Sequence, residues 1–234
     1  MGNLPVLMYH QVSLSKSEGL TIAAEKLEAH FAYLKEKGYR TYHCSELLSL
    51  RKLPHHRNVM ITFDDGYVDQ LELAYPLLKK YGLKATFFIP LKYLGKTDEW
   101  NSPSYPIMTA TQLRSLDPSV VELGFHSFAH RRYDEMTHNE VEADTKACFE
   151  ITSEEKLPLS AVLAYPYGRY PRTGTGQLQF EKHLSESLFQ LAFRIGNRIN
   201  KFPFKKPFEV QRLDVKGEYS LKKFKRKLTY GKLF

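Results

Sequence analysis

Short apolar runs alternate along the chain with stretches in which apolar residues recur at helical spacing. The runs that we expect to form strands are residues 4–9, 59–63, 85–89, 120–125, 161–165, 189–195 and 209–215. Strands that alternate with helices predict a parallel sheet covered by helices. About seven such strands in one domain favour a closed barrel over an open sheet. We therefore expect an α/β fold, a distorted TIM-like (β/α) barrel of about seven strands in a single domain.

The segments between these runs carry helix start and stop signals. Thr21 is the expected N-cap of a helix that ends at Gly38. Another helix is expected to end at Gly82, and residues 137–140 form a capping box for a helix that continues through Ile151. Residues 92–108 are rich in Gly, Pro and Ser and contain Trp100, and we expect them to form a long loop at the mouth of the barrel.

The composition supports a full hydrophobic core. Of the 234 residues 42% are apolar, and 15 Phe and 15 Tyr add large side chains to bury. No stretch approaches the roughly 18 uninterrupted apolar residues of a membrane span. The two cysteines, Cys44 and Cys148, are too few for a disulfide framework, and we expect both to be reduced core residues.

The beginning of the sequence bears on where the protein is found. Met1 to Asn3 lead directly into the first apolar run, without the basic segment and long apolar segment of a signal peptide. We therefore expect the protein in the cytoplasm, with the inner face of the membrane as one location there. If a leader has been removed, the protein is instead secreted.

The net charge of +8 is concentrated at the end of the chain. Residues 216–234 contain seven Lys or Arg and one acidic residue, which leaves the remainder close to neutral. Leu221, Phe224 and Leu228 recur there at helical spacing between the cations, so we expect residues 1–215 to form the barrel and 216–234 a basic amphipathic helix of the same domain. This helix either closes the fold with a solvated basic face or binds an anionic membrane surface. A nucleic-acid partner is not expected, because the body is near neutral and has no recognition motif.

Two adjacent carboxylates, Asp64 and Asp65, follow the expected strand 59–63. Burial and mutual repulsion oppose ionisation of such a pair, and a divalent cation would remove that cost. One carboxylate can then bind the metal while its neighbour faces a metal-bound water, and Gly66 permits the sharp turn. The sequence Asp-Asp-Gly is also common in ordinary solvated turns, so the motif alone leaves both interpretations open.

His126 and His130 follow the expected strand 120–125. The spacing of four places both imidazoles on one side of a helical turn, within reach of one ion. With Asp65 they would form a set of two imidazoles and one carboxylate with open positions, as in catalytic metal sites. A histidine pair alone is usually incidental, but two motifs at strand ends along one barrel mouth favour a metal.

Two further strand ends carry polar or turn-forming residues. His10 follows the first strand, and residues 164–168, Ala-Tyr-Pro-Tyr-Gly, follow strand 161–165. Proline and glycine in that segment predict a rigid loop whose backbone N–H groups face a developing oxyanion. An ordinary aromatic turn is the alternative interpretation of the same residues.

These motifs, in this order, resemble the polysaccharide deacetylases of carbohydrate esterase family 4, the NodB-homology domain. The resemblance spans roughly residues 4–215 and is most specific in Thr62 to Gly66 and His126 to His130. It implies that Asp64 is the general base and that Asp65, His126 and His130 bind one divalent metal ion. Zinc is the expected ion, with cobalt or nickel as substitutes. The backbone N–H of Tyr167 is implied as part of the oxyanion hole.

The sequence departs from the family pattern at two places. Many members have an Arg that orients the base at the position of Ala164, and many have a late Leu-x-His that supplies the acid, which is absent after Gly168. The run Val6 to His10 resembles a subgroup with shuffled motifs that includes poly-β-1,6-N-acetylglucosamine deacetylases. That resemblance makes His10 the candidate acid, and Arg212 or Asp214 the candidate replacements for the orienting group.

The expected function is metal-dependent removal of N-acetyl groups from an amino-sugar polysaccharide or glycan. Aromatic residues such as Tyr67, Trp100, Tyr105 and Tyr167 are expected to form a platform for the sugar. The expected substrate-binding residues are Tyr67, Trp100, Tyr165 and Pro166. An O-deacetylase or another small-amide hydrolase on the same fold is one alternative. A glycan-binding protein that keeps the metal without turnover is another, and Ala164 with the absent late His would point to it. The sequence does not indicate the oligomeric state.

Overall fold

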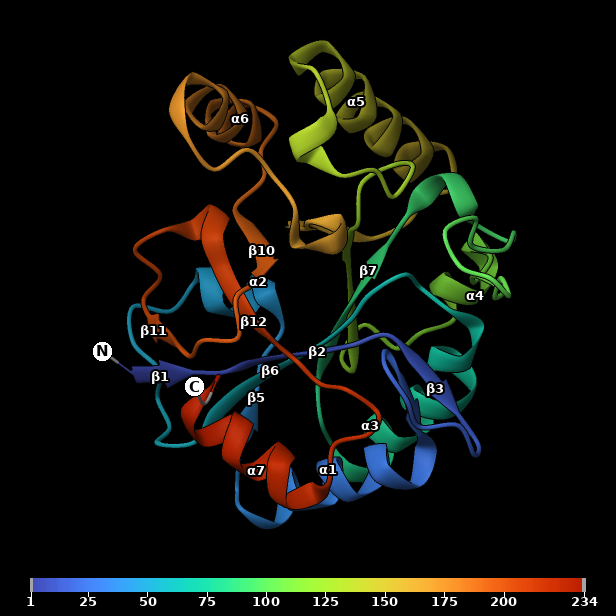
Figure 1. The fold of residues 1–234 in the computed structure, drawn as a ribbon, viewed down its shortest axis with the longest axis vertical. Coiled ribbons are helices and arrows are strands. Elements are labelled where there is room, and N and C mark those ends of the chain that lie inside the picture. Colours follow the sequence, from blue (N-terminus) through green and yellow to red (C-terminus); the bar gives the residue numbers. More distant parts are fainter. Residues whose placement is uncertain (1, 233–234) are drawn as a thin grey trace.

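Seven parallel strands close into a barrel in the computed structural model, which describes residues 2–232 (Figure 1). In hydrogen-bonded order they are β2 (Val6–Tyr9), β12 (Val210–Asp214), β10 (Leu191–Ile195), β9 (Leu159–Ala164), β8 (Val121–Phe125), β7 (Ala85–Ile89) and β6 (Asn58–Phe63). The pairing of β6 with β2, which places Val6 opposite Met60 and Tyr9 opposite Phe63, closes the barrel. The predicted α/β barrel of about seven strands in a single domain is confirmed.

Five short strands lie outside the barrel order and were not expected. β1 (Gly2–Leu4) pairs antiparallel with β11 (Asn200–Phe202), and β3 (Gln11–Ser13) pairs parallel with β4 (Thr21–Ala23). β5 (Arg40–Thr41) pairs with the first residues of β6. Segments of two or three residues are too short to show a period of two in the sequence.

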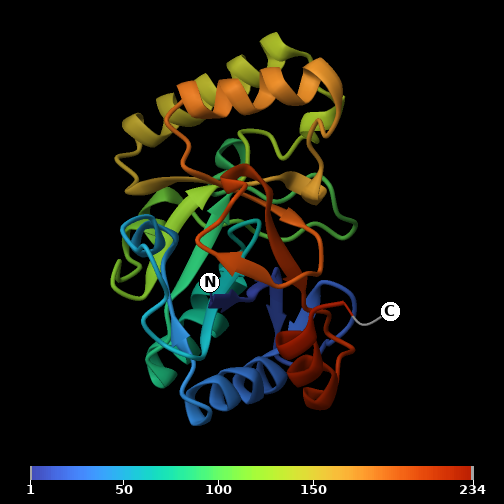
Figure 2. The ribbon, with the colours of Figure 1, turned by 90° about the vertical axis from the view of Figure 1, so that its left-hand side faces the viewer.

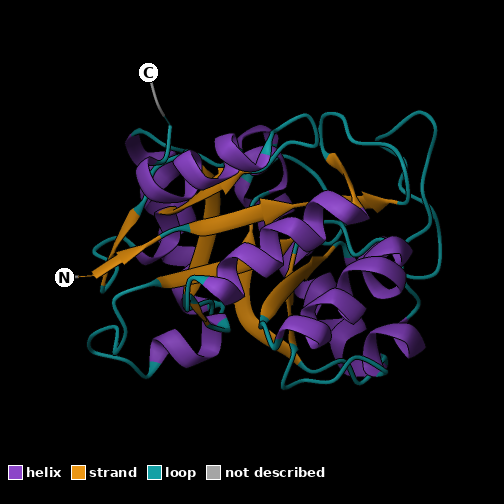
Figure 3. Cartoon of the chain, turned by 90° about the horizontal axis from the view of Figure 1, so that it is seen from below, coloured by secondary structure: helices purple, strands orange, loops and turns teal. Residues whose placement is uncertain are grey.

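Within the described residues, seven α-helices surround the strands (Figure 3). They are α1 (Ala24–Glu36), α2 (Cys44–Leu48), α3 (Tyr75–Tyr81), α4 (Ala110–Arg114), α5 (His138–Glu154), α6 (Gly174–Glu186) and α7 (Leu221–Tyr230). A π-helical turn, Gln70–Ala74, leads into α3, and 3₁₀ turns span residues 91–93, 133–135, 166–168 and 207–209. α1 and α7 lie together at one end of the molecule, and α5 and α6 at the other (Figures 1 and 2).

The helix signals in the sequence have mixed outcomes. The capping box of α5 is confirmed, because the Thr137 side chain accepts from the Glu140 N–H and the Glu140 carboxylate accepts from the Thr137 N–H. Gly82 ends α3 in the left-handed conformation, as expected. The assignment of Thr21 as an N-cap is wrong: Thr21 lies in β4, where its hydroxyl donates to Gln11 Oε1 at 2.7 Å, and the cap position is Ala23.

The core has two parts because alternate strand residues face the inside and the outside of the barrel. One cluster contains Met60, Phe88, Val162 and Phe193, which fill the interior. Gly124 belongs to this layer: a Cβ there would lie 2.8 Å from Phe88 and 2.9 Å from Val162. The larger cluster packs the outward residues of the strands against the helices.

Helix α7 packs on α1 through its apolar face. Phe224 stacks on His30 with ring centroids 3.7 Å apart, and Leu228 is also buried. Ser17 Oγ and Lys26 Nζ both donate to the Gly217 carbonyl at 2.7 Å, which ties the start of this segment to the body. The amphipathic helix expected within residues 216–234 is therefore present over 221–230, and residues 233 and 234 lie outside the described part. Its apolar face is covered by α1.

Both cysteines are buried and unpaired, as expected. Within residues 2–232, the helices are too short or too polar to cross a bilayer.

Candidate metal and catalytic site

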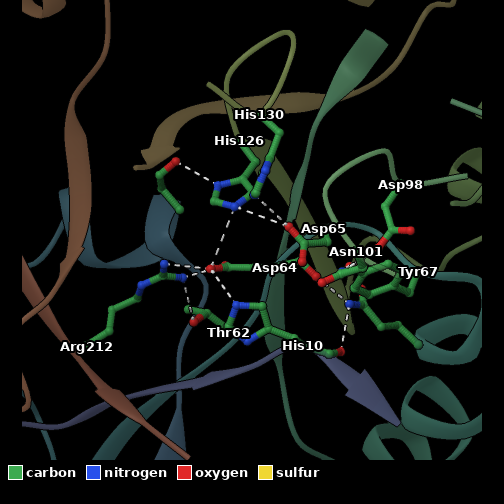
Figure 4. A network of polar contacts seen from close by, with 12 residues as sticks. His10, Thr62, Asp64, Asp65, Tyr67, Asp98, Asn101, His126, His130 and Arg212 are labelled. Carbon is green, nitrogen blue, oxygen red and sulfur yellow. Dashed lines mark hydrogen bonds and ion pairs between the residues drawn. The ribbon is translucent and has the colours of Figure 1, made fainter. Parts of the chain in front are cut away.

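Polar side chains from four barrel strands meet at one mouth of the barrel (Figure 4). His10 follows β2, Asp64 and Asp65 follow β6, His126 follows β8, and Arg212 lies within β12. Parallel strands in a barrel bring their carboxyl ends to the same rim, so residues far apart in the sequence become neighbours. The expectation that polar residues at the carboxyl ends of parallel strands meet at one rim is thus met by His10, Asp64, Asp65 and His126.

Backbone strain is concentrated at this rim. Asp65, Ser127, His130 and Tyr167 have φ between 53° and 74°, in the left-handed region that non-glycine residues rarely adopt. Each such residue costs on the order of 1–3 kcal/mol. Four of the seven non-glycine residues with positive φ in residues 2–232 thus lie within the predicted motifs. The fold tolerates this cost where side chains must point at one place, which is typical of functional sites.

Asp65, His126 and His130 form a buried group whose ligand atoms lie within 4.8 Å of one another. Asp65 Oδ1 is 3.4 Å from His126 Nε2 and 3.2 Å from His130 Nε2. By hydrogen-bond geometry Oδ1 has no partner, although it is buried. Two imidazoles and a carboxylate suit zinc and related divalent ions, and the unsatisfied oxygen fits a metal ligand. The residues therefore fit the implied ion.

The two histidines are oriented by different contacts. His126 Nδ1 lies 2.8 Å from the Ala164 carbonyl oxygen. With its proton on Nδ1, the ring donates to that carbonyl and leaves Nε2 free to bind a metal. Ala164 thus contributes its backbone at the position where many relatives were expected to supply an Arg side chain.

The segment from His126 to His130 is not a helical turn, so that part of the expectation is wrong. Ser127 and His130 both have positive φ, and the chain bends sharply between them. Asp144 of α5 holds the bend, because its carboxylate oxygens lie 3.0 and 3.1 Å from the Phe128 nitrogen and accept its N–H. The imidazoles converge through this bend and not through helical spacing. Nothing in the sequence signals Asp144, which is one buried acid on an amphipathic helix.

Asp64 is held by Arg212 through two hydrogen bonds. Arg212 Nη1 donates to Oδ1 at 2.5 Å and Nη2 donates to Oδ2 at 2.7 Å, and both side chains are fully buried. Burial alone would raise the pKa of Asp64, but Arg212, with His126 and His10, outweighs burial and lowers it. Asp64 is therefore ionised at neutral pH. Of the two candidates for the orienting group, the structure places Arg212 on Asp64.

The pKa values of the three residues in the candidate metal group follow from the same contacts. Burial would raise the pKa of Asp65, but the imidazoles of His126 and His130 beside its carboxylate hold it well below its usual value. Burial would lower the pKa of His126, yet the carboxylates of Asp64 and Asp65 raise it. For His130 burial prevails, and its pKa is lowered. An ionised Asp65 and a neutral His130 are the forms that bind a divalent metal.

His10 lies beside Asp64. Its Nε2 atom is 3.7 Å from Asp64 Oδ2, and its side chain remains partly accessible. Gln70 holds the two residues together, because its Nε2 donates to the His10 carbonyl at 2.9 Å and to the Asp64 carbonyl at 2.6 Å. Gln70 was not identified from the sequence, since a single glutamine in a helical segment carries no signal.

A cavity of about 300 Å³ opens over this group. Its lining residues are Met8, His10, Gln11, Leu20, Asp64, Asp65, Tyr67, Trp100, Asn101, His126, His130, Tyr167, Gly168, Ile195, Arg212 and Asp214. Two of the lining residues, Gln11 and Asp214, have a buried side-chain atom, Nε2 and Oδ1 respectively, that lacks a hydrogen-bond partner within residues 2–232.

The aromatic residues expected to contact a sugar lie in different surroundings. Trp100 and Tyr167 line the cavity, and Tyr167 is 50% exposed. Tyr67 reaches the cavity but is 2% exposed, with its hydroxyl bonded to Asp98, so it offers little surface for stacking. Tyr165 and Pro166 are buried and do not line the cavity. The Tyr165 hydroxyl donates to the Phe208 carbonyl at 2.9 Å, so the expected sugar contact of these two residues is not supported.

A sequence profile described as polysaccharide deacetylase matches residues 51–180, more than half of the chain. The chain belongs to the polysaccharide deacetylase family. The matched range contains the Asp64–Asp65 pair, both histidines of the candidate metal site and Tyr167. The family assignment expected from those motifs is therefore confirmed.

A curated relative supports the same assignment. The Bacillus subtilis (strain 168) protein YxkH, whose name describes it as a polysaccharide deacetylase, is 33% identical to this chain over 173 residues. The match covers 71% of this chain and 57% of YxkH. The chain thus spans little more than half the length of that relative.

Solved structures of deacetylases share the fold. The Streptococcus pyogenes deacetylase PplD, in complex with acetate, has a TM-score of 0.80 at 19% identity, covering 97% of this chain and 98% of PplD. A de-N-acetylase from Aggregatibacter actinomycetemcomitans has a TM-score of 0.79 at 21% identity, with 96% and 99% covered. IcaB from Ammonifex degensii has a TM-score of 0.77 at 21% identity, with 98% and 97% covered. At these identities the likeness concerns the fold.

Proposed function

We propose that this polysaccharide deacetylase removes N-acetyl groups from a glycan of the N-acetylglucosamine type with the help of one divalent metal ion. The observation that carries the proposal is the buried group of Asp65, His126 and His130 beside a second, ionised carboxylate, Asp64. A metal-dependent hydrolase of this kind needs a place for the metal and a separate base within reach of the attacking water. Zinc is the ion that this donor set favours, and cobalt or nickel are substitutes.

In this proposal Asp65, His126 and His130 hold the ion. When bound, the ion supplies Lewis-acid polarisation of the acetamide carbonyl and a lowered pKa for its water. Asp64 accepts a proton from the attacking water, and Arg212 keeps Asp64 ionised and correctly oriented. Both oxygens of Asp64 bond to Arg212, but each carboxylate oxygen can accept a second hydrogen bond.

The remaining steps use groups on either side of the base. We assign the Tyr167 backbone N–H to the developing oxyanion of the substrate, because the left-handed conformation of Tyr167 turns the backbone at the rim of the cavity. His10 is the candidate acid for the leaving amine nitrogen. It lies 3.7 Å from Asp64 Oδ2, lines the same cavity and comes from a different strand.

The substrate class rests on the cavity and on resemblance. The cavity combines aromatic residues, Trp100 and Tyr167, with polar lining residues such as Gln11 and Asp214, a mixture that suits a sugar ring and its hydroxyls. The Val6 to His10 run supports the subgroup that includes poly-β-1,6-N-acetylglucosamine deacetylases. The Aggregatibacter protein that shares this fold is itself described as a de-N-acetylase, which agrees with removal of an N-acetyl group here.

The proposal is tested by measuring metal content and acetate release together. Purified wild type and Asp65→Ala would be stripped with a chelator, reloaded with zinc or cobalt, and incubated with short β-linked N-acetylglucosamine oligomers. We expect one ion per chain and acetate release in the wild type, with both lost in the variant. Chelation should abolish turnover, and added zinc should restore it.

The alternatives give different results in the same assay. Acetate from O-acetylated but not N-acetylated oligomers would favour an O-deacetylase. Bound metal and bound glycan without any acetate would favour a glycan-binding protein that lacks turnover. A wild-type protein that binds no metal under any condition would contradict the proposed metal site and, with it, the proposed mechanism.

A further inference from the structure

His130 lacks the hydrogen bond that orients the other histidine of the site. His126 Nδ1 contacts the Ala164 carbonyl at 2.8 Å, whereas His130 Nδ1 is buried and has no partner among residues 2–232. Metal-binding histidines usually have such a bond, which fixes the ring and its tautomer. Another interaction must therefore hold the His130 ring toward Asp65.

Two aromatic rings pack against His130 instead. Trp100 stacks on the imidazole with centroids 3.8 Å apart and an angle of 20° between the planes. Tyr167 contacts it in an edge arrangement, with centroids 4.8 Å apart at 62°. A ring stacked at this distance restricts rotation of the imidazole plane.

A buried carboxylate, Asp98, orders the loop that carries Trp100. Asp98 is 1% exposed, and it accepts hydrogen bonds from the Tyr67 hydroxyl at 2.8 Å, Asn101 Nδ2 at 2.5 Å and the Tyr105 N–H at 2.6 Å. Figure 4 shows Tyr67, Asp98 and Asn101 together on the Asp65 side of the site. Among the described residues, Asp98 makes no ion pair with Lys, Arg or His. Neutral donors alone therefore compensate the loss of hydration of this buried carboxylate.

The same contacts connect the loop to the turn that carries Asp65. Tyr67 lies two residues after Asp65, and its hydroxyl reaches Asp98. The backbones are joined as well: the Met108 N–H donates to the Gly66 carbonyl at 2.9 Å, and the Val68 N–H donates to the Pro106 carbonyl at 3.0 Å. One connected unit thus carries a carboxylate of the site at one end and the ring stacked on His130 at the other.

We propose that Trp100, held in place by the Asp98–Tyr67 hydrogen bond, is a positioning residue that orients His130 for metal binding in place of the absent hydrogen bond at Nδ1. The inference rests on the metal site of the proposed function, but it concerns how that site is ordered. The proposed role depends on a planar aromatic ring stacked on His130, and an indole is not specifically required. A phenylalanine at position 100 should therefore serve in part, and an aliphatic residue should not.

The test measures zinc affinity of the full chain by competition with a chromophoric chelator, after removal of metal. Loss of an outer contact of a metal ligand typically weakens binding 10–100-fold. We expect Trp100→Leu to weaken zinc binding by about tenfold or more, and Trp100→Phe to retain affinity within about threefold of the wild type. Tyr67→Phe should also weaken binding, and its Trp100 emission should shift to longer wavelength because the ring is no longer held. Trp100 is the single tryptophan, so its emission reports this site alone.

Tyr105→Leu is the matched control. The Tyr105 ring packs on Tyr67 at 6.2 Å, and only its backbone N–H binds Asp98, so this variant disturbs the loop without removing the ring on His130. Its zinc affinity should stay near that of the wild type.

A Trp100→Leu protein that binds zinc as tightly as the wild type overturns the proposal, whatever its turnover. If Trp100→Leu does not fold, as judged by circular dichroism, an unchanged zinc affinity and emission in Tyr67→Phe overturns it. A wild type that binds zinc but releases no acetate contradicts the proposed function and leaves this inference standing.

Discussion

Arg212 and Asp64 are separated by 148 residues and form a buried two-point ion pair, with N–O distances of 2.5 and 2.7 Å. The pair joins β12 to the turn after β6 through the interior of the barrel. Arg212 also lies over the Phe88 ring, with its guanidinium carbon 5.5 Å from the centroid. Because a guanidinium matches a carboxylate at two points, it sets both the charge and the orientation of Asp64.

Replacing Arg212 by methionine should raise the pKa of Asp64, because burial is then less opposed by positive charge. In the native protein Arg212 helps to lower the pKa of Asp64. Loss of Arg212 should therefore move the acid limb of the kcat/KM profile to higher pH. The variant should also lose about 3–5 kcal/mol of stability, since it leaves a buried charge without its partner. A pH-rate profile and a denaturant titration measure the two effects. Arg212→Lys keeps the charge but not the two-point contact, so its acid limb should shift less; an unmoved limb in Arg212→Met would refute the assignment.

Asp64→Asn and Asp65→Asn should separate the base from the metal ligand. Asn at position 64 cannot accept a proton, so turnover should fall by about 10²–10⁴-fold while zinc stoichiometry stays at one ion per chain. Asn at position 65 removes the carboxylate of the metal group and should lower zinc occupancy itself. Metal analysis beside acetate release distinguishes the two variants. Equal loss of zinc in both would mean that the roles of the adjacent carboxylates are wrongly divided.

The buried His30 should make the protein less stable in mild acid. Burial, together with Lys26, lowers the pKa of His30 to about 3, whereas an unfolded histidine titrates near 6.5. Between these values the unfolded state binds more protons, so stability decreases as the pH falls from about 6.5 toward 3. At pH 5 the titration of this residue should lower the free energy of unfolding by about 2 kcal/mol relative to neutral pH.

His30→Gln removes this titration and keeps a polar atom near the Tyr9 hydroxyl, which lies 3.1 Å from His30 Nδ1. The loss of stability between pH 7.5 and pH 5, measured by urea unfolding, should therefore be smaller in the variant. His138→Gln is the control, because His138 is exposed at the start of α5. An identical pH dependence in His30→Gln and wild type would show that His30 is not held neutral.

The basic face of α7 provides a test of the expected membrane contact. Lys222, Lys223 and Arg226 are exposed. Lys223 lies over the Tyr219 ring at 3.9 Å and Lys225 over the Tyr33 ring at 4.5 Å. Since Phe224 and Leu228 are buried on α1, attraction to a bilayer would be electrostatic and would need no insertion of the helix. Removing the helix would expose the core, so charge reversal is the better experiment.

Lys222→Glu with Arg226→Glu should weaken binding to vesicles of anionic phospholipid by about 2 kcal/mol or more, at about 1 kcal/mol for each cation removed. Sedimentation with vesicles at low and moderate salt measures this. The control reverses Lys146 and Lys182, two exposed lysines of α5 and α6 at the other end of the molecule (Figure 2). Equal binding of both double variants would refute a membrane contact through α7.

Much of the site could be predicted from the sequence because its motifs are local. Asp64, Asp65, His126 and the barrel strands before them were all found from short apolar runs that end in polar residues. The rule that parallel strands present their carboxyl ends at one rim then brought the motifs together without knowledge of the contacts. Helix α6 was not predicted, although Phe180, His183 and Leu184 have helical spacing; its first turn contains two glycines, which are poor helix formers.

The sequence by itself therefore determined the class of fold, the strand order along the chain and the residues that could carry the chemistry, since each depends on a pattern within a few residues. Only the tertiary structure decided which of Arg212 and Asp214 meets Asp64, that Tyr165 is buried while Tyr167 is exposed, and that Trp100 covers His130. Those outcomes depend on the register of strands across the closed barrel and on the path of a long loop. A shift of one residue in register turns a side chain from the interior to the outside, and no local pattern in the sequence specifies that alignment between distant segments.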